Sequence, residues 1–236
     1  MKTPPPNAYN PQCIFQDDDL IIINKPSGLL SIPDGYNSSL PHLKTVLEPI
    51  YGRLWVVHRL DKETSGIMLL ARNEDAHRKL NKSFRERKIK KIYHSLITPV
   101  PIWREMHIKL PLTPNADRKH RTRVDHEKGK KAETICNIKK RSEFGALLEI
   151  HILSGITHQI RAHLRAFDLI ILGEPLYNAG LPSPPFPVQR LMLHSRSLGF
   201  EHPSDGNWMN FPAPYPDDFR AAYAKLLITT TRDVLI

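Results

Sequence analysis

Cysteine is scarce in this chain, which has only Cys13 and Cys136 among its 236 residues. Two cysteines cannot build the disulfide framework of a small secreted protein, and they fit a reducing cytosol. Long hydrophobic runs are also missing, because apolar stretches such as 20–23 and 69–71 are far too short to span a membrane. The N-terminal stretch lacks the apolar segment of a signal peptide. We therefore expect a cytoplasmic protein without a membrane segment.

Acidic residues are fewer than basic ones, 24 against 34, and the net charge is +10. A basic chain of this size often binds a polyanion. The cations gather at residues 85–91, 118–123, 128–131 and 139–141. Any one of these clusters fits a solvated surface, but all of them together favour a nucleic acid as the partner.

Internal repeats are absent, and proline-rich stretches occur only at the N-terminus and at residues 182–187. We expect residues 1–12 to form a flexible leader and residues 182–187 to form a rigid surface loop. The remaining length, residues 13–236, is compatible with one large domain. No linker in it is long enough to separate two independent folds.

Short β-rich segments alternate irregularly with segments of helical period. The strands that we expect are 20–24, 55–57, 66–71, 92–97, 132–139 and 146–153, with a hairpin joining the last two. The helices that we expect are 75–88, 157–167 and 217–227, with Asn73 or Asp75 as the cap of the first. Because strict βαβ alternation is missing, the pattern predicts an α+β fold with a mixed, mostly antiparallel β-sheet and flanking helices.

Residues 58–66, HRLDKETSG, connect two of the expected strands. Asp61 therefore lies on a loop at the edge of a sheet, and such loops often carry function. The alternative is a structural turn, in which Asp61, Thr64 and Ser65 cap backbone amides and Gly66 permits an unusual backbone angle.

HRLDKETSG resembles the signature of the RluA-type pseudouridine synthases, H-R-L-D-x-x-T-S-G. Four further segments are similar to motifs of that family and follow in the family's order. They are NKPSG at 24–28, KIY at 91–93, LLEI with SGITHQIR over 147–161, and RLMLH with FEHP over 190–203. The resemblance covers roughly residues 15 to 220. Five motifs in order are a far more specific signal than any one of them.

The resemblance implies a pseudouridine synthase fold with a central catalytic cleft, formed by one catalytic domain over residues 13–236. It implies that a specific uridine in ribosomal or transfer RNA is isomerised to pseudouridine. The C1′–N1 bond breaks, the uracil rotates, and a C1′–C5 bond forms. This chemistry needs no cofactor and no metal, and no obligate protein partner is evident. The separate N-terminal RNA-binding domain of the S4 type, found in some members, is not expected here.

The resemblance also implies roles for individual residues. Asp61 is the catalytic carboxylate, which either attacks the sugar or takes a proton from C2′. Arg161 is the cation that keeps Asp61 ionised, because a lone buried carboxylate is costly. Tyr93 stacks on the everted uracil and helps to move the C5 proton.

Substrate-binding roles are expected for Arg59, which replaces the everted base or holds a phosphate, and for Lys25, which supports the pocket. Ile150 and Leu153 are candidates for an apolar wall, with core packing as the alternative. Three positions depart from the family pattern. Ile156 stands in place of an arginine, which removes a cation near the site. Ser95 stands where a small alanine is common and Glu174 stands in place of an aspartate, and both are expected to be tolerable replacements.

Three other functions deserve a test against the structure. A hydrolase would use Ser65, His58 and Asp61, although these residues lie very close together along the chain and no G-x-S-x-G turn is present. A metal site would use His158 and His163, although a spacing of five does not put both on one helix face. A non-catalytic RNA-binding protein that retains the synthase fold is the remaining alternative.

Overall fold

The chain forms two compact units, and each unit is built from two separate segments of the sequence. Unit 1 comprises Met1–Lys91 and Ser195–Pro214, and unit 2 comprises Ile92–His194 and Tyr215–Ile236. The computed structural model describes residues 9–181, 183 and 185–228. Most of the expected leader, residues 1–8, and two positions of the expected loop at 182–187 lie outside the described residues. The expected single catalytic domain over residues 13–236 stays a prediction.

Unit 1 is organised around strands in the order β1-β2-β4-β12, in which the pairs β1–β2 and β2–β4 are antiparallel. The strands are β1 (Gln12–Gln16), β2 (Leu20–Lys25), β3 (Trp55–Val56), β4 (Ser65–Ala71), the end of β12 (Leu193–Glu201) and β13 (Trp208–Pro212). β3 pairs with β4, and β13 pairs with β12, both antiparallel. The register places Ile22 opposite Leu69 and Asn24 opposite Ile67, so alternate residues of β2 and β4 share a face.

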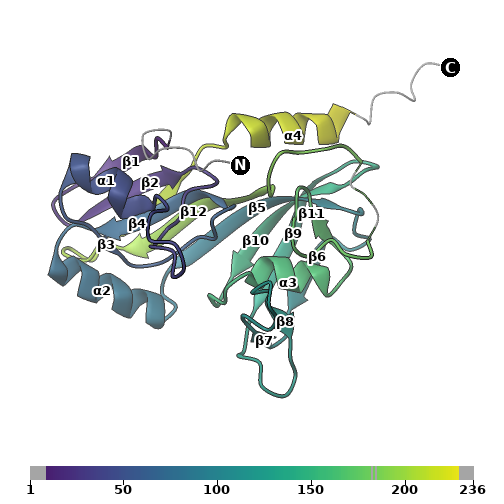
Figure 1. The fold of residues 1–236 in the computed structure, drawn as a ribbon, viewed down its shortest axis with the longest axis horizontal. Coiled ribbons are helices and arrows are strands. Elements are labelled where there is room, and N and C mark those ends of the chain that lie inside the picture. The colour runs from purple at the N-terminus through teal and green to yellow at the C-terminus, as the bar shows by residue number, and fades with distance from the viewer. Residues whose placement is uncertain (1–8, 182, 184, 229–236) are drawn as a thin grey trace. The chain divides into compact units, whose positions relative to one another are not determined.

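Two helices accompany the strands of unit 1 (Figure 1), α1 (Leu43–Tyr51) and α2 (Glu74–Arg85). α2 begins where expected, because the side chain of Asn73 accepts a hydrogen bond from the Ala76 amide at 2.8 Å. Its buried residues Ala76 and Leu80 join a core cluster with apolar side chains of β2, β4 and β12. This cluster holds one face of the unit 1 strands, and the loop that carries Asp61 leads directly into one of them.

Unit 2 contains a second set of antiparallel strands, in the order β5-β10-β9-β6 with β11 on the other side of β5. Its strands are β5 (Lys90–Thr98), β6 (Glu105–Ile108), β7 (Leu112–Thr113), β8 (Arg123–Val124), β9 (Thr134–Arg141), β10 (Ala146–Ile152) and β11 (Ile170–Ile171). The expected hairpin is the β9–β10 pair. β7 and β8 form a small sheet of their own.

The helices of unit 2 are α3 (Gln159–Arg165) and α4 (Asp217–Ile228). α3 starts two residues later than expected, because His158 has a left-handed backbone conformation with a φ of 53°. Gln159 then anchors the helix to β9, since its Nε2 donates to Thr134 Oγ1 at 2.9 Å. In α4, Phe219 and Leu226 are buried, as the helical period predicts.

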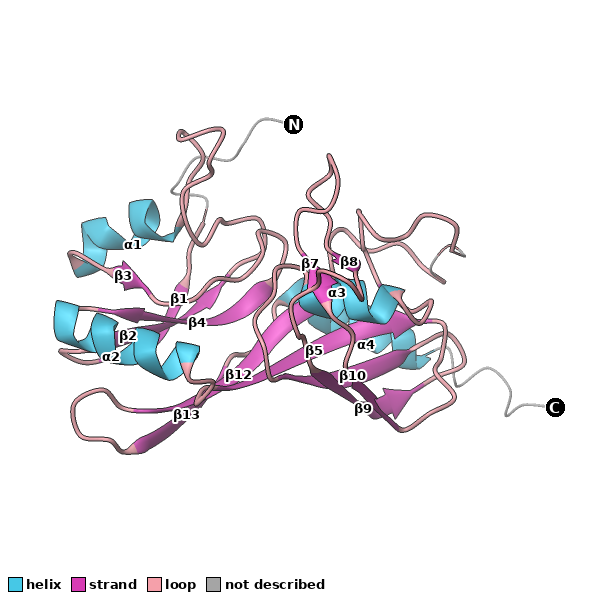
Figure 2. Cartoon of the chain, turned by 90° about the horizontal axis from the view of Figure 1, so that it is seen from below, coloured by secondary structure: helices cyan, strands magenta, loops and turns pink. Residues whose placement is uncertain are grey.

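The observed elements confirm the predicted α+β class with mostly antiparallel strands, and Figure 2 shows that both units contain strands and helices. The strands and helices that were expected are all present, with ends shifted by a few residues. Among the described residues, no helix combines the length and the apolarity that crossing a bilayer requires.

Candidate active site

The loop that carries Asp61 is fixed by backbone contacts on both sides of that residue. Ser31 Oγ accepts from the Leu60 amide at 3.0 Å and donates to the Leu60 carbonyl at 2.7 Å. The Gly28 amide donates to the Lys62 carbonyl at 2.8 Å, and Ser27 Oγ donates to the Glu63 carbonyl at 2.8 Å. The NKPSG segment and the residues after it therefore grip the HRLDKETSG loop, and Asp61 stands on a rigid backbone.

Lys25 lies at the centre of this arrangement and is completely buried. Its ammonium donates to the carbonyls of Leu29 at 2.8 Å, Pro26 at 2.9 Å and Lys62 at 3.2 Å. A buried charge is tolerated only where such partners replace water. The role that the structure assigns to Lys25 is to hold the Asp61 loop against the β2 end, while its expected contact with substrate stays a prediction.

Two further features of the HRLDKETSG loop follow from local packing. His58 Nε2 accepts from the Leu69 amide at 2.9 Å, and its ring stacks on Phe84 at 4.8 Å between centroids. Burial, reinforced by the charge of Lys91, lowers the pKa of His58 to about 3, so the ring is neutral. Gly66 has a φ of 116°, which confirms the unusual backbone angle expected there.

In unit 2, Arg161 is buried on α3 and forms a two-pronged salt bridge with Glu174. Its Nε donates to Glu174 Oε2 at 2.7 Å and its terminal nitrogen donates to Oε1 at 2.5 Å. The guanidinium also lies over the ring of Tyr177, 5.2 Å from the centroid. Arg161 is therefore no exposed helix residue, and the position of its charge is determined by a carboxylate and an aromatic face.

Tyr93 and Ile150 are direct partners in the register of β5 and β10, and both are buried. Neighbouring residues of this kind on one sheet face can form the apolar side of a pocket. Arg59 and Leu153 are exposed instead. Core packing is thus wrong for Leu153, because β10 ends at Ile152 and the next side chain is no longer covered.

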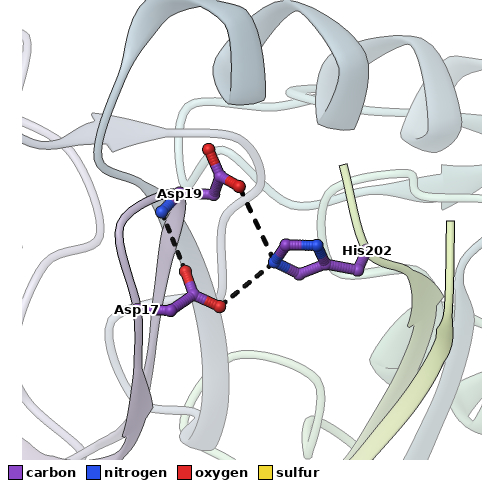
Figure 3. A group of neighbouring side chains, drawn as sticks. All are labelled: Asp17, Asp19 and His202. Atoms are coloured by element: carbon purple, nitrogen blue, oxygen red, sulfur yellow. Dashed lines mark hydrogen bonds and ion pairs between the residues drawn. The ribbon is translucent and has the colours of Figure 1, made fainter. Parts of the chain in front are cut away.

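Within the described residues, one group of side chains has atoms close enough to hold a metal, namely Asp17, Asp19 and His202 in unit 1 (Figure 3). His202 Nε2 lies 3.1 Å from Asp17 Oδ2. Asp17 Oδ1 accepts from the amides of Asp19 and Leu20, each at 2.8 Å. Because these atoms already bind one another, we assign the group a structural role: it ties the turn after β1 to the end of β12.

A comparison with protein families matches residues 19–166 to the RNA pseudouridylate synthase family. That match spans more than half of the chain and includes the Asp61 loop, Lys25, Tyr93 and Arg161. The chain belongs to this family.

The relatives of this synthase carry the same activity in their names. This chain is 34% identical over 213 residues to the dual-specificity RNA pseudouridine synthase RluA of Escherichia coli K12, and the match covers 87% of this chain and 96% of the relative. It is 37% identical over 229 residues to an uncharacterised RNA pseudouridine synthase of Aquifex aeolicus, covering 90% and 72%. The human RNA pseudouridylate synthase domain containing 4 superposes with a TM-score of 0.74 at 25% identity, covering 91% and 92%. The chain is thus an RluA-type RNA pseudouridine synthase, an isomerase that acts on RNA.

The geometry of the synthase argues against a hydrolase site and against a metal site. Ser65 is fully buried in β4, and the base that a hydrolase would use, His58, already accepts a backbone hydrogen bond. His163 uses both ring nitrogens, toward Thr134 Oγ1 at 2.8 Å and the Leu110 carbonyl at 3.0 Å. His158 Nδ1 lies 3.1 Å from the Tyr177 hydroxyl. Both histidines therefore contact neighbouring protein groups, which argues against a metal site formed by this pair.

Sequence reasoning missed two residues that shape the site. Glu174 was expected as a tolerable replacement for aspartate, and its pairing with Arg161 is new. Ser31, which holds Leu60 from both sides, carried no motif signal. The sequence could have indicated the role of Glu174. It is the one acidic residue in the mostly apolar segment 169–177, and a carboxylate that is buried in such a segment needs a cationic partner. Ile156, which replaces a family arginine, packs against the cluster of Leu112, Ala132, Ala162 and Tyr177.

Proposed function

We propose that this synthase isomerises a uridine in a stem-loop of ribosomal or transfer RNA, with Asp61 as the essential carboxylate. The anchored backbone on both sides of Asp61 carries the proposal, because a nucleophile or base must be held within a fraction of an ångström of the reacting atom. A loop or bulge is the favoured substrate, since eversion of a base costs less there than in a continuous duplex.

The proposed roles divide the reaction among a few side chains. Asp61 acts on the ribose while the C1′–N1 bond breaks, and Arg161 is the cation of the proposed site. Tyr93 holds the freed uracil by stacking, and C5 then bonds to C1′. C5 loses its proton with the help of the Tyr93 hydroxyl, and N1 ends with one proton, so no atom is gained or lost overall. Arg59, which is exposed, replaces the everted base in the stack or binds a phosphate. Ile150 supplies an apolar wall.

Three features support the substrate range and the place of action. The E. coli relative is named as a dual-specificity enzyme, which supports more than one RNA as substrate. The net charge of +10 suits a polyanionic partner. The two cysteines are free, which fits the reducing cytoplasm that we propose as the location.

The decisive experiment maps pseudouridine in total RNA from cells that lack the gene and carry a plasmid copy. The wild-type copy should restore a pseudouridine that the deletion loses, and that position names the target. Asp61→Ala should restore none while its affinity for the RNA changes less than about threefold, because the carboxylate acts in chemistry. Asp18→Ala removes an exposed carboxylate of the same unit and should behave as wild type. Full restoration by Asp61→Ala would remove this residue from its role.

A substrate deuterated at C2′ separates the two routes open to Asp61. Removal of a proton from C2′ breaks the C–D bond and predicts a several-fold slower single-turnover rate. Attack on C1′ leaves that bond intact and predicts an almost unchanged rate.

A further inference from the structure

A pocket of about 520 Å³ lies in unit 2, and none of the side chains proposed for the reaction belongs to its lining. Three segments line the pocket. The first is β8 with the loop that precedes it, the second is the C-terminal half of α3, and the third is the stretch that follows β11. The volume falls within the range of pockets that hold a small organic group in proteins. The first segment contains the basic cluster at residues 118–123.

Three arginines face this pocket, and they differ in how firmly they are paired. Arg121 is committed to Asp117, with Nε to Oδ2 at 2.6 Å. Arg165 binds Asp168, whose side chain is 77% exposed. Arg123 is 68% exposed, and its nearest carboxylate, Asp125, is 3.9 Å away. Arg123, followed by Arg165, is therefore the cation most available to an incoming anion.

Small apolar side chains form the rest of the surface. Ala162 and Ala166 lie four residues apart along α3, and Ala116, Val124 and Ala179 complete the apolar lining. Alanine leaves room for a flat group and offers it a hydrophobic surface. A pocket with an apolar interior and cations at its edge fits a nucleobase joined to a phosphate better than it fits a free anion.

The aromatic wall of the pocket is held rigidly. The Tyr177 hydroxyl accepts from the Thr122 amide at 2.7 Å and lies 3.1 Å from His158 Nδ1. Its ring is also covered by the Arg161 guanidinium. The pocket therefore keeps its shape without a ligand, which lowers the entropic cost of binding.

We propose that this pocket holds an unpaired nucleotide of the RNA substrate other than the uridine that is isomerised. Its base lies against the alanines and Tyr177, and its phosphate lies at Arg123 and Arg165. The choice of RNA as the ligand rests on the proposed function. Proteins read single-stranded RNA by capturing splayed bases in this way. The pocket then contributes to the choice of the RNA loop, and its loss raises KM and leaves the chemical step unchanged.

The test uses the full chain and two tetranucleotides without uridine, A4 and C4, so that no reaction occurs. NMR of methyl groups should show shifts at Val124, Ala166 and Ala179 for at least one of them. Ala166→Trp fills the pocket from an exposed position and should raise the Kd of that tetranucleotide about tenfold, the size expected for one lost stacked base. Ala221→Trp, at an exposed position of α4, is the matched control and should change the Kd less than about twofold.

The cations are tested in the same assay. Arg123→Gln should weaken binding more than Arg118→Gln, which removes another exposed charge of the same cluster outside the pocket lining. Three results would each overturn the proposal. The first is that the two glutamine variants weaken binding equally, and the second is that the two tryptophan variants do so. The third is that inorganic phosphate shifts the methyl signals but neither tetranucleotide does.

Failure here is distinguishable from failure of the proposed function. If pseudouridine is mapped but the tetranucleotides leave the pocket methyl groups unshifted, the pocket assignment alone is wrong. If the tetranucleotides bind in the pocket but deletion of the gene changes no pseudouridine, the proposed target is wrong and the pocket still binds RNA.

Discussion

Unit 1 and unit 2 each bury a cation that belongs to the proposed site, but the two cations have different partners. Lys25 in unit 1 faces three backbone carbonyls, whereas Arg161 in unit 2 faces the carboxylate of Glu174. An ammonium is a compact charge that suits carbonyls converging from different directions, and a guanidinium is a planar fork that suits a carboxylate. Lys25 thus holds the backbone of the Asp61 loop in place, whereas the Arg161 side chain is itself held in place by Glu174.

The largest effect is expected from breaking the pair in unit 2. Glu174→Gln places an amide N–H₂ against the guanidinium and leaves the buried charge of Arg161 without its carboxylate. The free energy of unfolding should fall by about 3–5 kcal/mol. Glu143→Gln, on the exposed β9–β10 turn, should change it by less than about 0.5 kcal/mol. Urea unfolding of both variants measures the difference, and similar stabilities would show that Arg161 does not depend on Glu174.

The next effect concerns the carbonyls in unit 1. Lys25→Met removes the donor that the carbonyls of Pro26, Leu29 and Lys62 share and should cost about 3 kcal/mol of stability. Lys25→Arg should not restore it, because the fork does not match three converging acceptors. Lys62→Met removes an exposed lysine from the same loop and serves as the control. Full rescue by arginine would erase the contrast between the two units.

A histidine in unit 1 provides the pH test. The pKa of His58 is lowered to about 3 in the folded chain against about 6.5 when unfolded, so the unfolded state binds the proton first as the pH falls. The stability that neutral His58 contributes is therefore complete above pH 6.5 and is lost progressively toward pH 3. Between pH 7 and 5.5 the loss should be about 1 kcal/mol. His58→Gln should flatten the unfolding free energy over this interval, and an unchanged pH profile would contradict the assignment.

The smallest effect is expected in the surface group of unit 1 shown in Figure 3. Hydrogen bonds from Ser204 and Asn73, with the charge of His202, lower the pKa of Asp19. Asp19→Asn should cost less than about 1 kcal/mol at pH 7, because the group is partly solvated. The difference from wild type should shrink as the pH falls through the lowered pKa of Asp19. Thermal unfolding at several pH values, with Asp18→Asn as the control, measures this.

Local signals predicted the parts of the fold that have a strong period. α2 has a cap residue and apolar side chains four apart, and β2 and β4 each contain an unbroken apolar run of four or more residues. α1 was missed because Pro49 lies inside it and no acidic residue marks its first turn. β12 was missed as a strand although the motifs at its two ends were noticed, because histidine, serine and arginine interrupt its apolar pattern. β13 was missed because its short sequence, WMNFP, contains an asparagine and ends in proline.

The candidate site was predictable to a similar degree. Motifs named Asp61, Tyr93 and Arg161, but a lysine before a proline, such as Lys25, looks like a surface residue. Its burial depends on carbonyls that come from residues 26, 29 and 62, and only the tertiary structure brings these together. The same holds for Arg161 and Glu174, which are 13 residues apart and meet only when the chain turns back after α3.

Gly66, the last residue of the HRLDKETSG motif, affects how loss-of-function mutations in this protein should be interpreted. A Cβ at this position would overlap the backbone of Ser195 on β12, so even alanine would force two strands apart. A screen scored by loss of modified RNA would rank Gly66 beside Asp61, although one residue is a spacer and the other a proposed reactant. Measuring the amount of folded protein in each mutant is what would tell them apart.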